Sequence, residues 1–164
     1  MRARMLSRYL DTDGDGTGTK NAIGDYSGAA EEFFIEVPAS KHYSIARLIV
    51  RIEDVGNFDA GKYGNNITLT NGIEVEVRDN DDVVLIDLTD GVAIKTNAQW
   101  AGLCHDLTIH AFGTGNDTAT IRWTFARSGD PIALEAGHKL VVKLNDAFDN
   151  LVQHYFLLQG QEYD

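Results

Sequence analysis

Short runs in which apolar and polar residues alternate fill most of this chain after residue 32. The clearest is Ile73-Glu-Val-Glu-Val-Arg78, which alternates strictly and is typical of a strand with one buried and one solvated face. Tyr43–Ile52 is mostly apolar, with Arg47 and Arg51 expected to face solvent. Further runs of strand length, bounded by turn residues, are Phe33–Val37, Val83–Leu88, Val92–Lys95, Asp106–Phe112, Thr118–Phe125, Lys139–Leu144 and His154–Gln159.

These runs predict an all-β protein, an antiparallel β-sandwich of about eight strands with a jelly-roll-like arrangement. The short connections favour antiparallel pairing. Asn71-Gly72 and Asp90-Gly91 can supply the positive φ angles of tight turns, and they lie in two similar segments, Leu69–Ile73 and Leu88–Val92. Asn145–Leu151 is the segment that we expect to form a helical turn.

The first 31 residues differ in composition, because Asp, Gly, Thr and Ser dominate after Leu10. We find no convincing strand pattern there, so residues 1–31 are predicted to form an extended N-terminal arm and residues 32–164 the sandwich domain. Such an arm cannot by itself bury enough apolar surface to offset an ordering cost of about 1–2 kcal/mol per residue. We therefore expect another chain to order it. The side chains expected to anchor it are Tyr9, Leu10, Ile23 and Tyr26.

The chain is acidic, with 25 Asp and Glu against 14 Lys and Arg and a net charge of −11. It therefore lacks the clustered positive charge that nucleic-acid binding requires. The start of the chain is the exception, since Arg2, Arg4 and Arg8 lie among ten residues that include no acid. A basic tip on an acidic body predicts that the tip docks on an acidic partner or a neighbouring copy.

Cysteine content and hydropathy give an expectation about location. The single cysteine, Cys104, permits no disulfide within the chain. No apolar run reaches the length of about 18 residues that a membrane-spanning helix needs. Met1–Arg8 lacks the apolar segment of a secretory signal. These features predict synthesis in a cytoplasm and no association with a membrane.

Asp11–Gly16 resembles the start of a calcium loop of the helix–loop–helix type. Asp11, Asp13 and Asp15 occupy its first, third and fifth positions, with a glycine where the loop turns sharply. The twelfth position should hold a bidentate Glu but is Ala22, and no helical pattern follows. Two interpretations stay open: a weak Ca²⁺ site completed by other ligands, or a rigid turn without a cofactor.

No set of side chains with catalytic spacing stands out, and the usual hydrolase, metalloprotease and phosphate-loop motifs are missing from the sequence. Cys104-His105-Asp106 has suitable residue types, but neighbours on a strand point to opposite faces. His105 and His110 are separated by five positions and would also face opposite ways. The sequence therefore predicts a protein that is not an enzyme.

Two tryptophans are candidates for contact surfaces. Trp123 alternates with Ile121 and Phe125, so we expect it in the core. Trp100 lies in a predicted loop, where its ring would either stack on a sugar or contact a neighbouring subunit. The polar turn Asp79–Asp82 is expected to be a solvated hairpin connection.

The chain resembles the small virion proteins encoded among the head genes of tailed bacteriophages, which are described as virion structural, decoration or cement proteins. The segments that carry this resemblance are Arg8–Ala22, Leu69–Ile73, Leu88–Val92, Ile94–Asn97, Ile121–Phe125 and Leu144–Leu151. The resemblance implies a β-sandwich on the outer capsid lattice, often as a trimer, whose arm reaches across subunits of the major capsid protein. Its expected location is the capsid exterior, after synthesis in the host cytoplasm.

The first hypothesis is therefore a non-enzymatic capsid decoration protein that stabilises the lattice by bridging its subunits. The residues expected to bind the partner are Arg2, Arg4, Arg8, Tyr9, Leu10, Ile23, Tyr26 and Trp100. The alternative is a calcium-assisted carbohydrate-binding sandwich or another tail or fibre component of a virion. An exposed Trp100 would favour carbohydrate binding, and a buried one would not.

Overall fold

The computed structural model describes residues 2–18, 21–104, 106–111, 115–125 and 130–164, and this part of the chain holds ten strands and one helix. In chain order the elements are β1 (Ala3–Tyr9), β2 (Glu31–Glu36), β3 (His42–Val55), β4 (Ile73–Arg78), β5 (Val84–Asp87), α1 (Asn97–Cys104), β6 (Leu107–Ala111), β7 (Asn116–Thr124), β8 (Ile132–Leu134), β9 (Lys139–Leu144) and β10 (Gln153–Tyr163).

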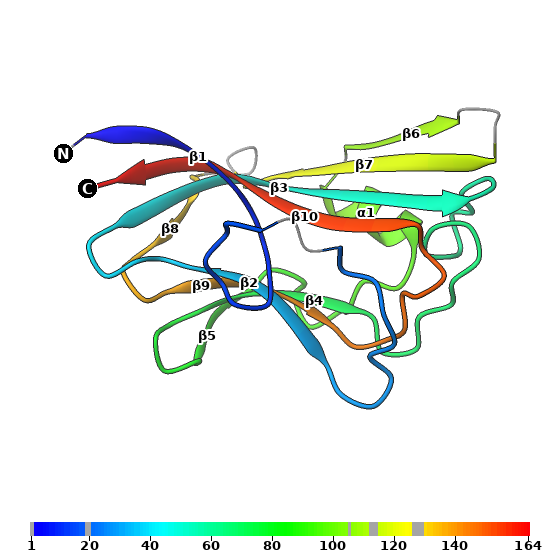
Figure 1. Cartoon of the computed structure of the whole chain (residues 1–164), viewed down its shortest axis with the longest axis horizontal. Coiled ribbons are helices and arrows are strands. Elements are labelled where there is room, and N and C mark those ends of the chain that lie inside the picture. Colours follow the sequence, from blue (N-terminus) through cyan, green and yellow to red (C-terminus); the bar gives the residue numbers. More distant parts are fainter. Residues whose placement is uncertain (1, 19–20, 105, 112–114, 126–129) are drawn as a thin grey trace.

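The strands form two antiparallel sheets that lie face to face (Figure 1). The larger sheet has the order β1-β10-β3-β7-β6, with β8 also pairing with β3, and the smaller has the order β2-β9-β4-β5. Without β6 and β8, the pairs are nested along the chain: β1 with β10, β2 with β9, β3 with β7, and β4 with β5. This is the pairing of a long hairpin rolled into a jelly roll, which confirms the predicted fold class.

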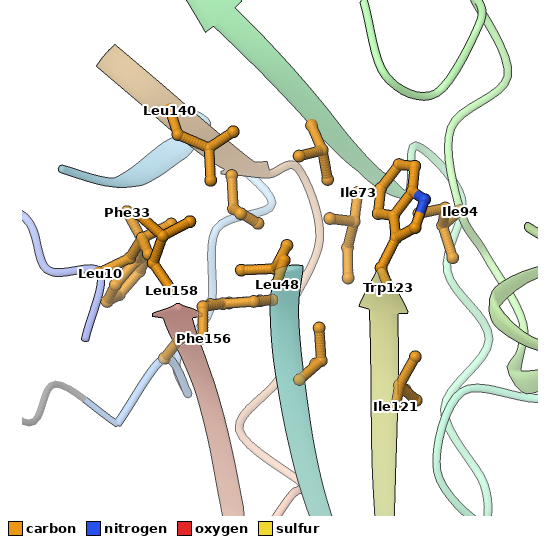
Figure 2. Packing of buried hydrophobic residues seen from close by; sticks show 14 of the residues in the cluster. Leu10, Phe33, Leu48, Ile73, Ile94, Ile121, Trp123, Leu140, Phe156 and Leu158 are labelled. Atoms are coloured by element: carbon orange, nitrogen blue, oxygen red, sulfur yellow. The ribbon is translucent and has the colours of Figure 1, made fainter. Parts of the chain in front are cut away.

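Alternating side chains build the core between the sheets. In β4, Val75 and Val77 are buried, whereas Glu74 and Glu76 lie on the outer face. There Glu74 pairs with Lys143, at 3.0 Å. Figure 2 shows the apolar side chains from both sheets and from the N-terminal segment packed together. The burial of Trp123 in this core confirms one prediction.

The N-terminal segment departs from the prediction of an extended arm without a strand. β1 is an edge strand of the larger sheet, paired along Ala3–Tyr9 with Leu157–Tyr163 of β10. It runs beside the C-terminal strand, so that both chain ends lie at the same end of the sandwich (Figure 1). Leu6 and Leu10 are buried in the core. The prediction of no strand was wrong because β1 buries only one of its seven side chains, that of Leu6, and so shows almost no alternation in the sequence.

Three further local predictions need correction. The helix lies at Asn97–Cys104, whereas Asn145–Leu151 forms turns without a helix. Val92–Lys95 is not a strand, although Ile94 forms an isolated bridge with Ile73. β8 is a three-residue strand in a segment that carried no strand prediction. Among the predicted strand ends, Phe112 lies outside the described residues.

The predicted turns do adopt the expected backbone geometry. Gly72, Asp90 and Gly91 all have positive φ, at 89°, 52° and 73°. The first turn has an additional support from Asp146, whose carboxylate accepts hydrogen bonds from the backbone N–H groups of Thr70, Asn71 and Gly72. The two similar segments differ in backbone conformation, because Asp90 has positive φ and Asn71, the corresponding residue, does not. Different side chains also hold them, since Asp87 accepts the N–H groups of Thr89 and Gly91 in the second turn.

Candidate functional site

The acidic loop, Asp11–Gly16, crosses from the larger sheet to the smaller one. It follows β1 directly, and its backbone then pairs with β2. The N–H of Phe34 donates to the Asp11 carbonyl at 2.8 Å, and the N–H of Glu36 donates to the Gly14 carbonyl at 2.9 Å. The loop therefore ties together β1 and β2, which belong to opposite sheets at the same side of the sandwich.

Glycine is required at both turns of the acidic loop. Gly14 and Gly16 have φ values of +76° and +68°, where other residues are strained. A Cβ atom on Gly14 would also overlap the ring of Phe34. The two glycines thus allow the loop to lie flat against β2 and bring its acidic side chains together.

Asp11, Asp13 and Asp15 each place one carboxylate oxygen within 4.8 Å of the other two. Asp11 is fully buried, at 0% exposure, whereas Asp13 and Asp15 are exposed. Its Oδ1 accepts the N–H of Gly14 at 2.7 Å. Its Oδ2 is buried and has no hydrogen-bond partner. Asp15 accepts hydrogen bonds from the N–H and the hydroxyl of Thr17, both at 2.8 Å.

Burial raises the pKa of Asp11, and the neighbouring Asp13 carboxylate raises it further. The loop therefore concentrates negative charge that would be relieved by a proton or by a cation. Within the described residues, no other group of three or more His, Cys, Asp or Glu side chains converges in this way.

The structure also shows why the twelfth position of the calcium-loop pattern, Ala22, holds no ligand. Ala22, at the twelfth position, is fully buried and its N–H donates to the His154 carbonyl at 2.7 Å. Asn21 accepts the N–H of His154 and so fixes the same segment to β10. The chain therefore returns to the larger sheet after the loop, and position 22 cannot supply a ligand.

Several residues predicted to bind a partner instead pack within this chain. Leu10 is a core residue, and Ile23 and Tyr26 are partly buried against the same core. Tyr26 packs near Phe148, with ring centroids 6.3 Å apart. The anchors predicted for contact with another chain therefore hold residues 10–18 and 21–26 on their own domain.

Trp100 is completely buried, which overturns its prediction as an exposed contact residue. It lies in α1, where its Nε1–H donates to the Tyr63 hydroxyl at 3.3 Å and its ring meets Trp123 edge-on at 6.1 Å. The interpretation as a carbohydrate-binding module rested on an exposed Trp100 and loses that stacking surface. The sequence did indicate a helix here, since Thr96 and Gln99 form a capping box at its start.

The basic residues remain on the surface. Arg2, Arg4 and Arg8 are all exposed, and Arg4 lies 3.5 Å from Asp164 at the C-terminus. Arg8 lies beside the acidic loop, since a Cβ atom on Gly16 would lie 3.0 Å from the Arg8 Cβ. These positions leave the basic tip available for a partner, although the strand that carries it belongs to the sandwich.

Tyr9 lies on the outer face of the larger sheet. Its ring meets Tyr155 edge-on at 6.0 Å. A shallow hollow of about 200 Å³ opens there, and its lining consists of Tyr9, Ile49, Arg51, Thr120, Tyr155 and Leu157. Tyrosine and arginine are enriched among the residues that dominate protein–protein interfaces. Of the predicted binding residues, Tyr9 is therefore the one placed on a surface of suitable composition.

Within the described residues, the longest run of exposed apolar side chains was not among the predicted sites. Val83, Val84, Leu85 and Ile86 follow one another along β5 and its entry, and each is between 43% and 56% exposed. β5 is an edge strand of the smaller sheet. Its register with β4 shifts between Ile86 and Val84, leaving Leu85 without a cross-strand partner. The run lies within the strand predicted at Val83–Leu88, but none of its residues was predicted to bind a partner.

The candidate chemical groups in the core are held in neutral form. Burial raises the pKa of the Cys104 thiol, which donates to the Trp100 carbonyl at 2.8 Å. His154 is buried, and burial lowers its pKa to about 3. Of the other two members of the Cys104-His105-Asp106 trio, Asp106 lies 3.7 Å from Arg122 near the surface, and His105 lies outside the described residues.

Comparisons with protein-family models, with curated protein sequences and with solved structures found no match for this chain. No helix in the described ranges has the length and apolar character needed to cross a membrane.

Proposed function

We propose that this protein is a non-enzymatic decoration, or cement, protein of a tailed-bacteriophage virion that binds the outer capsid lattice and bridges subunits of the major capsid protein. The observation that carries the proposal is the exposed apolar edge formed by Val83–Ile86. The sequence resemblance to phage head proteins supplies the identity of the partner.

The apolar edge fits a protein that works within an assembly. A contiguous exposed apolar run on a sheet edge promotes aggregation unless a partner covers it. The bulge at Leu85 disrupts the edge, so a partner is expected to engage its side chains and not to add a strand. Full burial of one such side chain contributes about 1.5–3 kcal/mol, so a few of them anchor a subunit on a lattice.

Architecture and charge support the same proposal. Jelly rolls occur in viral capsid domains but also in lectins, so the fold by itself does not select a function. An acidic body is expected to meet the lattice through apolar side chains and its basic tip, because like charges repel at a contact. Binding of each copy to the assembled lattice then opposes disassembly by mass action, and association as a homotrimer would multiply weak contacts.

Analysis of virions tests the function directly. Virions of the phage that encodes this chain are purified, and quantitative mass spectrometry measures the number of copies of the chain per particle. Cryo-electron microscopy then locates the chain on the particle. We expect many copies on the capsid exterior. Absence of the chain from the particles, or density confined to the tail or fibres, would overturn the proposal.

A pair of variants tests the proposed surface. Leu85→Lys places a charge on the apolar edge, and Ile109→Lys makes the same change at a side chain of similar exposure, 44%, on edge strand β6 of the other sheet. We expect Leu85→Lys to lose binding to undecorated capsids and Ile109→Lys to retain it, with both proteins folded by circular dichroism. Wild-type binding should persist in molar salt, because apolar contacts are not screened. Equal binding by both variants would exclude this surface.

A further inference from the structure

We propose that Asp11, Asp13 and Asp15 bind a calcium ion, and that the bound ion fastens the two sheets together where the acidic loop crosses from β1 to β2. This inference concerns the isolated protein and does not depend on the capsid proposal. It rests on the convergence of three carboxylates and on an unsatisfied buried oxygen of Asp11.

The spacing of the three carboxylates suits one calcium ion. Calcium lies about 2.3–2.6 Å from its oxygen ligands, so two ligands of one ion are at most about 5 Å apart. Oxygens of Asp11, Asp13 and Asp15 all lie within 4.8 Å of one another. This separation allows the three carboxylates to share one calcium ion.

The second observation is the state of Asp11. Its side chain is fully buried, one oxygen is used by the N–H of Gly14, and the other, Oδ2, has no partner. A buried polar atom that is left unpaired destabilises the folded state, and the penalty is larger when the group is charged. A cation beside Asp13 and Asp15 would satisfy this oxygen and neutralise the crowded carboxylates.

The donor set selects calcium among common metal ions. All three side chains offer carboxylate oxygen, which suits hard cations, and the cluster contains no imidazole or thiolate of the kind that zinc prefers. Magnesium demands near-ideal octahedral geometry, whereas calcium accepts the irregular arrangement that a glycine-rich loop provides. Because Ala22 stands where a bidentate Glu would be, the three aspartates are the acidic ligands available to the ion. We therefore expect a weak site, with a Kd of about 10⁻⁴ M.

The ion would act on the edge of the sandwich. The acidic loop is joined to β2 through the backbone bonds of Asp11 and Gly14, and to the larger sheet through β1. Fixing Asp13 and Asp15 to the buried Asp11 would hold this crossing in one conformation. A ligand that binds only the folded state stabilises it, so calcium should raise the stability of the whole domain.

Calorimetry and thermal unfolding of chelator-treated protein test the proposal. Calcium at about 100 times its Kd raises the ratio of folded to unfolded protein about 100-fold, or about 2.7 kcal/mol. For a domain of this size that corresponds to a rise in Tm of about 5–10 °C. Titration calorimetry should show one site per chain. Magnesium at the same concentration should give a clearly smaller shift.

Asp13→Ala and Asp81→Ala are the matched variants. Both remove one exposed aspartate, but Asp81 belongs to the hairpin turn at Asp79–Asp82 and lies outside the proposed site. We expect Asp13→Ala to lose the heat of binding and the shift in Tm, and Asp81→Ala to keep both. Equal shifts with calcium and magnesium that persist in Asp13→Ala would show general screening of the acidic chain and overturn the proposal. Absence of any calcium effect on the wild type would also overturn it.

Discussion

Acidification should destabilise this protein through one buried histidine. His154 lies at the centre of the core, where its Nδ1 is 3.1 Å from the Ala22 carbonyl and its Nε2 is 2.8 Å from the Tyr63 hydroxyl. A carbonyl can only accept, so Nδ1 must carry the proton and Nε2 must accept from Tyr63. The Tyr63 hydroxyl in turn accepts the indole N–H of Trp100. The network is satisfied only when His154 is neutral.

The magnitude follows from the shift in pKa. Burial lowers the pKa of His154 from 6.5 to about 3, although the Ala22 carbonyl offsets part of this effect. Between these values the unfolded chain binds a proton that the folded chain does not, so stability is full above pH 6.5 and falls as the pH decreases. Each pH unit in that window costs up to about 1.4 kcal/mol. From pH 7 to 4.5 the loss amounts to about 2.5 kcal/mol, a large part of a typical stability of about 5–15 kcal/mol.

Other titrating groups act outside this window or with the opposite sign. The lowered pKa values of Asp82 and Asp87 reflect hydrogen bonds from Lys139 and Thr89, and the corresponding stability is lost only near and below their ordinary value of 3.8. The raised pKa of Asp11 works the other way, since its folded form takes up a proton more readily. A comparison of variants removes these shared contributions.

Chemical denaturation followed by tryptophan fluorescence measures the effect, because both tryptophans are buried in the folded state. His154→Gln keeps a donor and an acceptor but cannot titrate, and His110→Gln removes an exposed histidine of β6 as the control. We expect wild type and His110→Gln to lose about 2.5 kcal/mol between pH 7 and 4.5. His154→Gln should be less stable at pH 7 but lose clearly less on acidification. An equal loss in all three proteins would refute the assignment to His154.

Three further predictions concern the backbone. Gly160→Ala should lower the free energy of unfolding by more than about 2 kcal/mol, because its Cβ would overlap the Ser44 carbonyl in the adjacent strand. Gly102→Ala, in the helix with no atom near the new Cβ, should instead stabilise by about 0.5–1 kcal/mol in the same denaturation assay. Asp146→Ala removes the acceptor of three backbone N–H groups and should cost about 2–3 kcal/mol, whereas unchanged stability would show that water replaces the carboxylate.

The sequence was most informative where a strand has one buried and one solvated face. β4 alternates strictly between buried and partly exposed residues, and its limits, Ile73 and Arg78, were predicted from that pattern. The limits of β9, Lys139 and Leu144, were also predicted, although Leu140, Val141 and Val142 are all buried. β1 could not, because an edge strand with a single buried residue, Leu6, leaves almost no pattern. α1 was missed because Trp100 was interpreted as a loop residue, although the capping box of Thr96 and Gln99 marked the start of the helix.

The nested strand pairing of the jelly roll could not be predicted from the local sequence pattern either. Turn chemistry identifies neighbouring strands, such as β4 and β5, but β1 and β10 lie at opposite ends of the chain. Their pairing depends on which apolar faces can be buried together once every intervening strand is placed. Long-range pairing of this kind carries a loop-closure cost before its contacts form, so no short segment encodes it.

The acidic loop shows how the same limit applies to a site. The spacing of Asp11, Asp13 and Asp15 predicted a possible ligand set, but an exposed acidic turn and a metal site share that spacing. What separates them is the burial of Asp11, which results from pairing of its backbone with Phe34 of β2. That pairing exists only because β1 and β2 enter opposite sheets on the same side of the sandwich. The three carboxylates of the loop can therefore be recognised from the local sequence. The buried, unpaired oxygen of Asp11, which favours a cation, is a consequence of the tertiary fold.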